Sequence, residues 1–165
     1  MTGLAVIDFE ASCLPDDGFS FPIEVALARV GGASRSWLIR PATRWRYWDW
    51  SEQAEGLHGI SRQMLEEKGY PAGQVLAELA QEAAGCTVYA DSDLDVYWLE
   101  TLAEACDMPP PFPILYIGEF FQQTHVSGPQ IEQAEDLARL RMPRLHIARN
   151  DARRLAITLE LLSAA

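Results

Sequence analysis

The sequence opens on an apolar run that leads directly into two acids: residues 3–12 read Gly-Leu-Ala-Val-Ile-Asp-Phe-Glu-Ala-Ser. A short, continuous apolar run such as Leu4 to Ile7 predicts a buried central strand. Because side chains alternate along a strand, Asp8 and Glu10 should project from the same side near its C-terminal end. Their charges repel, and burial adds a desolvation cost, unless a cation lies between them. Hard oxygen ligands favour Mg²⁺ or Mn²⁺ in that position.

Asp8 and Glu10 also allow a simpler interpretation, in which the strand has ended and both carboxylates are solvated. An Asp-x-Glu motif is short enough to occur by chance. The choice between a metal site and two surface acids therefore depends on the chemistry of the rest of the chain.

Length and composition indicate a single domain over residues 1–165, since 48% of the 165 residues are hydrophobic and 22% are charged. The sequence contains no stretch of about 18 apolar residues, so we expect no membrane span. The N-terminus shows no basic region followed by an apolar segment, so we expect no secretion signal. Three scattered cysteines without metal-type spacing predict reduced thiols in a cytoplasmic protein.

The net charge of −11 limits how this chain could bind nucleic acid. A protein that grips long nucleic acid through phosphates is normally basic, whereas an acidic one needs metal ions to supply local positive charge. We therefore expect weak, local binding near a substrate end. A solvated helix surface is the commoner explanation for the arginines that gather near the C-terminus. These are Arg139, Arg141, Arg144, Arg149, Arg153 and Arg154.

The rest of the chain alternates between strand and helix patterns. Residues 23–30 and 34–40 predict a hairpin about the Gly31-Gly32 turn. Further apolar runs predict strands at 86–90 and 114–117. Helical patterns occur after Ser61, at 74–84, at 93–106, at 130–140 and after Pro143. This order predicts an α/β or α+β sheet covered by helices, with the acid-bearing strand at or next to its centre.

Residues 41–50 contain four large aromatic side chains: Trp45, Tyr47, Trp48 and Trp50. Stacking on nucleic-acid bases is one use for such a cluster. Packing of a long loop against the body of the protein is the other. We favour packing, because large aromatic residues mostly serve burial.

The predicted helix at 93–106 carries a third candidate acid, Asp95. It lies on the flank of the inward-facing stripe of that helix. The stripe consists of Leu94, Trp98, Leu99, Leu102 and Cys106. An acid in a first turn also stabilises a helix through its dipole. Asp91 and Asp93 compete for that capping role, however, and leave Asp95 less explained by it.

His146 and Asp151 form the last candidate pair and lie five residues apart. On one helix, the two side chains would point about 140° apart. They converge only if His146 belongs to the loop before the helix and Asp151 to its first turns. Pro143 favours that arrangement, because helices tend to begin shortly after such a break.

Together these parts resemble the DEDD superfamily of 3′→5′ exonucleases, and specifically its histidine-bearing, DnaQ-like (DEDDh) branch. The order of the parts matches over nearly the whole chain, and the joint pattern is far more specific than any one motif. Four stretches carry the resemblance: Val6-Ile-Asp-Phe-Glu-Ala-Ser12, Leu57-His-Gly-Ile-Ser61, Val88-Tyr-Ala-Asp-Ser-Asp-Leu-Asp-Val-Tyr-Trp-Leu99 and His146-Ile-Ala-Arg-Asn-Asp-Ala152.

The resemblance implies an RNase H-like α/β fold, with a mixed five-stranded sheet flanked by helices. It also implies phosphodiester hydrolysis with two divalent ions, Mg²⁺ or Mn²⁺. Asp8, Glu10, Asp95 and Asp151 are the metal ligands that it implies, and His146 is the general base.

The stretch at 57–61 is similar to the family's loop near the terminal nucleotide of the substrate. The resemblance therefore implies a set of substrate-binding residues: Phe9, Ala11, Ser12, His58 and Ile60. By position, Phe9 or Ile60 is expected to act as a wedge against the last base.

The middle motif departs from the family's usual form, an Asn followed by a Phe-Asp pair. Asp91 stands where the Asn would be, and Leu94 replaces the Phe. The spacing is kept at Asp95, which is the expected third carboxylate. Asp91 stays open as the alternative, whereas Asp93 points elsewhere on the helix.

The Asp-Phe-Glu-Ala-Ser motif is more similar to RNA-trimming members of the family than to proofreading subunits, which tend to carry Thr at the position of Phe9. We therefore expect the substrate to be a single-stranded 3′ end, RNA in preference to DNA, and the products to be nucleoside 5′-monophosphates. The resemblance also allows a homodimer. A DNA exonuclease of proofreading or repair type, a non-catalytic nucleic-acid-binding module and an adaptor that uses the aromatic cluster stay open. The complete set of acids and histidine argues against the non-catalytic binding module. The adaptor, which would show tight partner binding and no metal affinity, ranks last.

Overall fold

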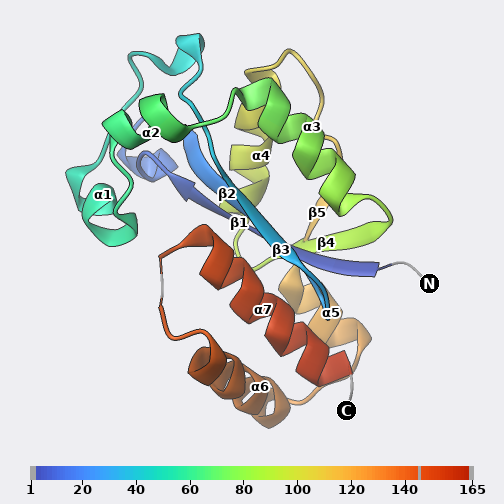
Figure 1. The fold of residues 1–165 in the computed structure, drawn as a ribbon. Coiled ribbons are helices and arrows are strands. Elements are labelled where there is room, and N and C mark those ends of the chain that lie inside the picture. The colour runs from blue at the N-terminus through green and yellow to red at the C-terminus, as the bar shows by residue number, and fades with distance from the viewer. Residues whose placement is uncertain (1–2, 145, 164–165) are drawn as a thin grey trace.

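The computed structural model describes residues 3–144 and 146–163 (Figure 1). Its centre is a five-stranded sheet with the order β3-β2-β1-β4-β5. The strands are β1 (Gly3–Ala11), β2 (Pro22–Arg29), β3 (Ser34–Leu38), β4 (Cys86–Ala90) and β5 (Ile114–Tyr116). β1 pairs antiparallel with β2 and parallel with β4, so the sheet is mixed. The acid-bearing strand occupies the middle position, as its apolar run predicts.

Seven α-helices accompany the sheet in the described ranges. They are α1 (Glu52–His58), α2 (Arg62–Lys68), α3 (Ala72–Ala83), α4 (Leu94–Glu104), α5 (Ile117–Gln123), α6 (Gly128–Arg141) and α7 (Ala148–Ser163). Helices α3 and α4 cover one face, and α7 crosses the other face with α5 and α6 beside it (Figure 1). Among the described helices, none is long and apolar enough to cross a membrane.

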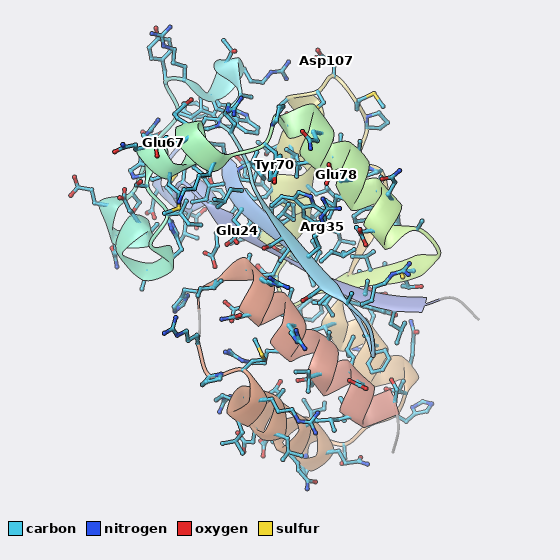
Figure 2. All side chains as sticks on the ribbon, viewed as in Figure 1. Glu24, Arg35, Glu67, Tyr70, Glu78 and Asp107 are labelled. Carbon is cyan, nitrogen blue, oxygen red and sulfur yellow. The ribbon has the colours of Figure 1, made fainter. Side chains whose placement is uncertain are left out.

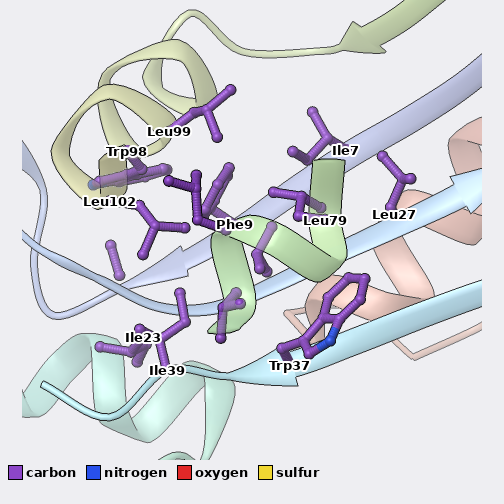
Figure 3. Close-up of a cluster of buried hydrophobic side chains, with 14 of the residues drawn as sticks. Ile7, Phe9, Ile23, Leu27, Trp37, Ile39, Leu79, Trp98, Leu99 and Leu102 are labelled. Carbon is purple, nitrogen blue, oxygen red and sulfur yellow. The ribbon is translucent and has the colours of Figure 1, made fainter. Parts of the chain in front are cut away.

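Two hydrophobic clusters form because successive β1 side chains face opposite sides of the sheet. Ile7 and Phe9 pack with apolar side chains of α3 and α4 (Figure 3). Val6 belongs to the other cluster, which α7 covers. Asp8 and Glu10 continue the Val6 side of the strand, so both carboxylates are directed toward α7.

Small residues allow α7 to lie close to the sheet. On the helix, Ala148, Ala152 and Ala156 are buried, and they meet Ala26 and Ala28 of β2 in the same cluster. Alanine on both sides lets two backbones approach without a cavity. The first turn of α7 is thereby placed over the acid-bearing part of β1.

The sequence patterns do not predict two of the observed helices. α1 begins after Ser51, whose side chain accepts a hydrogen bond from Ala54 N at 3.2 Å. Ser51 as an N-cap residue is the local sequence signal for α1. α5 follows β5 without a loop, so the apolar run that predicts a strand at 114–117 turns into a helix at Ile117.

The start of α4 corrects a further expectation. Leu94 N donates to Ser92 Oγ at 3.1 Å. Asp93, which precedes the helix, makes no side-chain capping hydrogen bond. The shorter Ser92 therefore performs the capping for which Asp91 and Asp93 are expected to compete.

The loop-packing interpretation of the aromatic cluster is confirmed for Trp45. Its ring is fully buried and stacks on Phe21 with the centroids 5.5 Å apart. Trp50 is held by a hydrogen bond from its indole N–H to Glu55 at 2.7 Å. Tyr47 is 88% exposed, so burial does not account for that side chain.

Candidate active site

Three carboxylates from two distant segments meet beside the C-terminal half of β1. The strand supplies Asp8 and Glu10, and the first turn of α7 supplies Asp151. One oxygen from each carboxylate lies within 4.8 Å of the oxygens from the other two. The two strand acids therefore share one side, as the alternation of the strand predicts, and the cluster offers three hard oxygen ligands.

Two oxygens of this cluster are buried without a hydrogen-bond partner among the described residues: Asp8 Oδ2 and Asp151 Oδ1, although Arg154 Nη1 lies 3.5 Å from the latter. A buried acceptor without a partner costs about 1–3 kcal/mol, and more when it is charged. A divalent cation would relieve that cost. The oxygen-only donor set suits Mg²⁺ or Mn²⁺ better than a softer metal. The residues present thus fit the ions that the sequence resemblance implies.

Asp95 comes to the same region from the other face of the sheet. It lies in the first turn of α4, is 2% exposed, and accepts a hydrogen bond from Phe9 N at 3.0 Å. The ladder between β1 and β4 ends at the pair of Val6 with Tyr89. Phe9 lies beyond the end of that ladder, so the Asp95 carboxylate replaces a strand carbonyl as the acceptor for its N–H. Burial, followed by the charge of Asp95, raises the pKa of Asp8 well above its usual range.

The crowding of acids perturbs the other carboxylates as well. Burial raises the pKa of Glu10 to about 7, and the charges of Glu24 and Asp151 add to the effect. Burial and the charge of Asp91 raise the pKa of Asp95 to about 8, although a backbone hydrogen bond opposes them. Without a cation, part of the cluster holds protons at neutral pH. A bound metal ion would displace those protons.

The structure separates the three acids of the middle motif. Asp95 is buried, whereas the side chains of Asp91 and Asp93 are exposed. Asp91 still lies near the cluster, because its charge raises the pKa of Asp8 and of Asp95. The position of Asp95 beside β1 favours it as the third carboxylate, in agreement with the motif spacing.

Glu24 is an acid of this region that the sequence patterns miss. It lies on β2 directly opposite Glu10, is 8% exposed, and its Oε2 accepts a hydrogen bond from Ala148 N at 3.3 Å. Figure 2 shows Glu24 beside the start of α7. Its signal in the sequence is an acid inside an otherwise apolar strand. A surface position on an alternating strand explains such a residue equally well, so the pattern alone does not identify it.

His146 lies in the segment before α7, which begins at Ala148, and Asp151 lies in the first turn. This is the arrangement that allows residues five apart to converge. His146 adopts a φ of 58°, a left-handed conformation that non-glycine residues seldom take. The residue is exposed and lines a cavity together with Glu10. The imidazole of His146 is therefore open to solvent and lies beside Glu10.

The cavity next to the acids has a volume of about 280 Å³. Of the predicted substrate-binding residues, Phe9, Ala11 and His58 line it. The structure adds lining residues that the sequence does not single out: Cys13, Leu14, Asp17, Ser51, Gln53, Ala54, Leu57 and Trp98. Gln53, Ala54 and Leu57 belong to α1. Because the sequence patterns do not predict that helix, they do not predict this wall of the cavity either.

Ser12 and Ile60 are placed differently from the other predicted substrate-binding residues. Neither is among the described residues that line this cavity. The Ser12 hydroxyl accepts a hydrogen bond from Phe21 N at 3.1 Å and so fixes the loop after β1. Ile60 is buried and lines a neighbouring cavity with Glu24 and Tyr70, and His58 borders both cavities.

The ring of His58 is oriented by the backbone two residues further along the chain. Its Nδ1 accepts a hydrogen bond from Ile60 N at 3.0 Å, so Nε2 carries the proton when the ring is neutral. Burial lowers the pKa of His58 and favours that neutral form. His58 thus brings a neutral imidazole to the wall of the cavity.

The fold is shared with solved nuclease structures at low sequence identity. A 3′-exonuclease, in a structure of 3′-end-specific recognition of the histone mRNA stem-loop, is 16% identical, with a TM-score of 0.72 over 99% of this chain and 64% of that chain. E. coli Exonuclease I in complex with a dA16 oligonucleotide is 12% identical, with a TM-score of 0.76 over 99% of this chain and 41% of that chain. Cell-death related nuclease 4 (CRN-4) is 15% identical, with a TM-score of 0.68 over 99% and 64%.

This likeness defines the class of fold. The mixed five-stranded sheet and its flanking helices form the RNase H-like α/β fold that the sequence resemblance implies, and solved 3′-exonuclease structures share it. The chain spans between 41% and 64% of the length of the three structures. No protein-family model matches the sequence. No curated protein sequence matches it either.

Proposed function

We propose that the protein is a metal-dependent 3′→5′ exonuclease that removes nucleoside 5′-monophosphates from single-stranded nucleic acid, RNA in preference to DNA. One observation carries the proposal: the oxygens of Asp8, Glu10 and Asp151 converge within 4.8 Å beside a cavity that His146 also lines. The fold shared with solved 3′-exonucleases supports it.

In this proposal, Asp8, Glu10 and Asp151 hold divalent ions, and Asp95 contributes to the same shell. When bound there, such ions would supply Lewis acidity at the scissile phosphate and would activate a water for attack. His146 accepts the proton of that water on its imidazole, because histidine is the side chain that most often acts as a general base in enzymes.

The cavity walls bind and orient the terminal nucleotide. Phe9 and Trp98 provide apolar surface, while His58 offers a neutral ring to a polar group of the substrate. The volume of about 280 Å³ is of the size of one nucleotide, which agrees with binding of a terminal residue. His146 is exposed, so solvent water can reach the side of the cavity where the proposed base lies.

RNA is the preferred substrate because of the similarity of the Asp-Phe-Glu-Ala-Ser motif to RNA-trimming enzymes. DNA is the second candidate, because the structures with this fold include one in complex with a dA16 oligonucleotide. The overall charge of −11 favours short substrates in either case, since long-range attraction of a polyanion is weak.

The test is hydrolysis of 5′-labelled single-stranded RNA and the matched DNA with Mg²⁺ or Mn²⁺. Wild type should produce a ladder that shortens from the 3′ end, and Asp8→Asn or a chelator should abolish it. Asp136→Asn is the matched control, because Asp136 is an exposed acid on α6 that pairs with Arg139. Cleavage of circular oligonucleotides at the same rate would contradict an exonuclease. Binding without cleavage would identify a non-catalytic module.

A further inference from the structure

Arg154 lies one turn after Asp151 on α7 and faces the candidate metal ligand. Its Nη1 forms an ion pair with Asp151 Oδ1 at 3.5 Å. The side chains of both residues are largely buried, with 16% of Arg154 and 22% of Asp151 exposed. An ion pair shielded in this way is weakened less by salt than a surface pair.

The same guanidinium also contacts the segment that leads to His146. Nε and Nη2 donate to Met142 O at 3.1 and 2.6 Å, and Nη2 donates to Arg144 O at 3.1 Å. Arg154 thus satisfies two backbone carbonyls just beyond the end of α6. The group that faces Asp151 therefore also holds the segment between α6 and α7.

We propose that Arg154 is a positioning residue that fixes the His146 segment relative to Asp151. The proposal rests on the proposed function, in which His146 is the general base and Asp151 is a metal ligand. Residues 142–144 and 146–147, the described part of this segment, lie outside any helix or strand, so the position of His146 depends on contacts such as those of Arg154. Small displacements of a catalytic group are costly: about 1 Å lowers a rate by about a hundredfold.

The chemistry of arginine suits this task. Its guanidinium is planar and carries five N–H donors in a fixed fork, so it can serve two carbonyls and one carboxylate together. Lysine would keep the charge near Asp151 but would lack the fork. A neutral side chain of similar length, such as methionine, would lose both.

A purely structural alternative is that Arg154 only caps the C-terminal end of α6, where cations are favourable. That role would stabilise the fold without any specific link to His146. A double-mutant cycle separates the two roles, because only a positioning residue depends on the presence of the group that it positions.

The first test compares Arg154→Met in the wild-type and His146→Ala backgrounds, on the full chain with single-stranded RNA and Mn²⁺. We expect Arg154→Met to lower kcat by about tenfold to a hundredfold with His146 present, and by less than about twofold in its absence. KM should stay within about twofold, and Arg154→Lys should restore part of kcat. Equal losses of kcat in both backgrounds would overturn the proposal.

The second test does not require activity. Limited trypsin digestion of the folded, metal-free protein measures opening of the chain at Arg144. Arg154→Met should accelerate this cleavage, whereas Arg153→Met, at the exposed neighbouring residue, should match wild type. Identical cleavage rates in both variants would contradict the positioning role. A wild type with no nuclease activity would instead refute the proposed function, and the cleavage rates would still decide whether Arg154 holds the segment.

Discussion

The carboxylate of Glu24 accepts a hydrogen bond from the backbone N–H of Ala148 at 3.3 Å, where α7 begins. The contact joins β2 to the helix that supplies Asp151, and Glu24 also faces Glu10 across the strand pair. The N-terminal N–H groups of a helix have no partner within it, and a negative charge there is favourable. Glu24 therefore stabilises the approach of α7 to the acid cluster, although its own charge adds to the repulsion there.

Glu24 should stabilise the fold mainly as a hydrogen-bond acceptor. Glu24→Ala removes the cap of α7 and should lower the free energy of unfolding by about 1 kcal/mol. Glu24→Gln keeps an acceptor oxygen and removes a charge that repels Glu10 and Asp151, so it should stay within about 0.5 kcal/mol of wild type. Urea unfolding in the presence of chelator measures both values. Equal destabilisation by the two substitutions would show that the charge, and not the acceptor, is what α7 needs.

Metal binding should offset the loss of stability that the metal-free protein shows as the pH rises. The pKa of Glu10 is raised from 4.5 to about 7 and that of Asp95 from 3.8 to about 8, so the folded protein holds these protons more tightly than the unfolded chain. Their contribution is complete below about pH 4 and is lost as the pH rises through 7 and 8. With chelator, Tm should therefore fall between about pH 6 and pH 8.5. Excess Mg²⁺ should raise Tm most at the upper end, where fewer protons compete.

Thermal unfolding across that pH range, with chelator and with Mg²⁺, checks this expectation. One kcal/mol corresponds to about 2–4 °C in Tm for a chain of this size. Asp8→Asn should flatten both curves, because it removes one charge of the cluster and one ligand. A chelated protein that becomes more stable toward pH 8.5 would contradict the crowding of carboxylates described here.

His146 and Asp151 should differ in the step that they affect. His146→Ala removes the proposed base and should lower kcat by about 10²–10⁴-fold, while the affinity for Mn²⁺ stays unchanged. Asp151→Asn removes a proposed ligand and should weaken Mn²⁺ binding as well as kcat. Calorimetric titration with Mn²⁺ and single-turnover hydrolysis separate the two effects. If His146→Ala weakens Mn²⁺ binding as much as Asp151→Asn, then His146 is a ligand and not the base.

The acid-bearing strand and the terminal helix could be predicted from patterns among residues close together in the sequence. The alternation of a strand places Asp8 and Glu10 on one side, and the break at Pro143 places His146 before α7. These arguments need only the local period of the chain and the position of a helix start. The mixed, five-stranded character of the sheet came from the resemblance to a known family, because pairing between distant strands leaves no local signal.

The residues that escaped prediction depend on contacts between distant elements. Glu24 is buried because α7 crosses β2, and nothing near Glu24 in the sequence indicates that crossing. Arg154 belongs to a run of arginines, most of which are exposed, and its carbonyl partners lie at Met142 and Arg144. Ser12 stays a predicted substrate-binding residue, and its hydrogen bond from Phe21 N is the contact that the sequence did not indicate.

The third carboxylate of the candidate site can be assigned by comparing Asp95 with Asp91. Asp95→Asn keeps an acceptor for Phe9 N but removes a buried charge next to Asp8, so kcat should fall by about a hundredfold or more with little loss of stability. Asp91 is exposed, and Asp91→Asn restores the residue type usual in the family, so its kcat should stay within about threefold of wild type. Parallel measurement of kcat and Mn²⁺ affinity, with unfolding curves as the control, distinguishes the two. A larger loss in Asp91→Asn than in Asp95→Asn would move the third ligand to the exposed position, and would mean that the middle motif departs from the family in its chemistry as well as in its sequence.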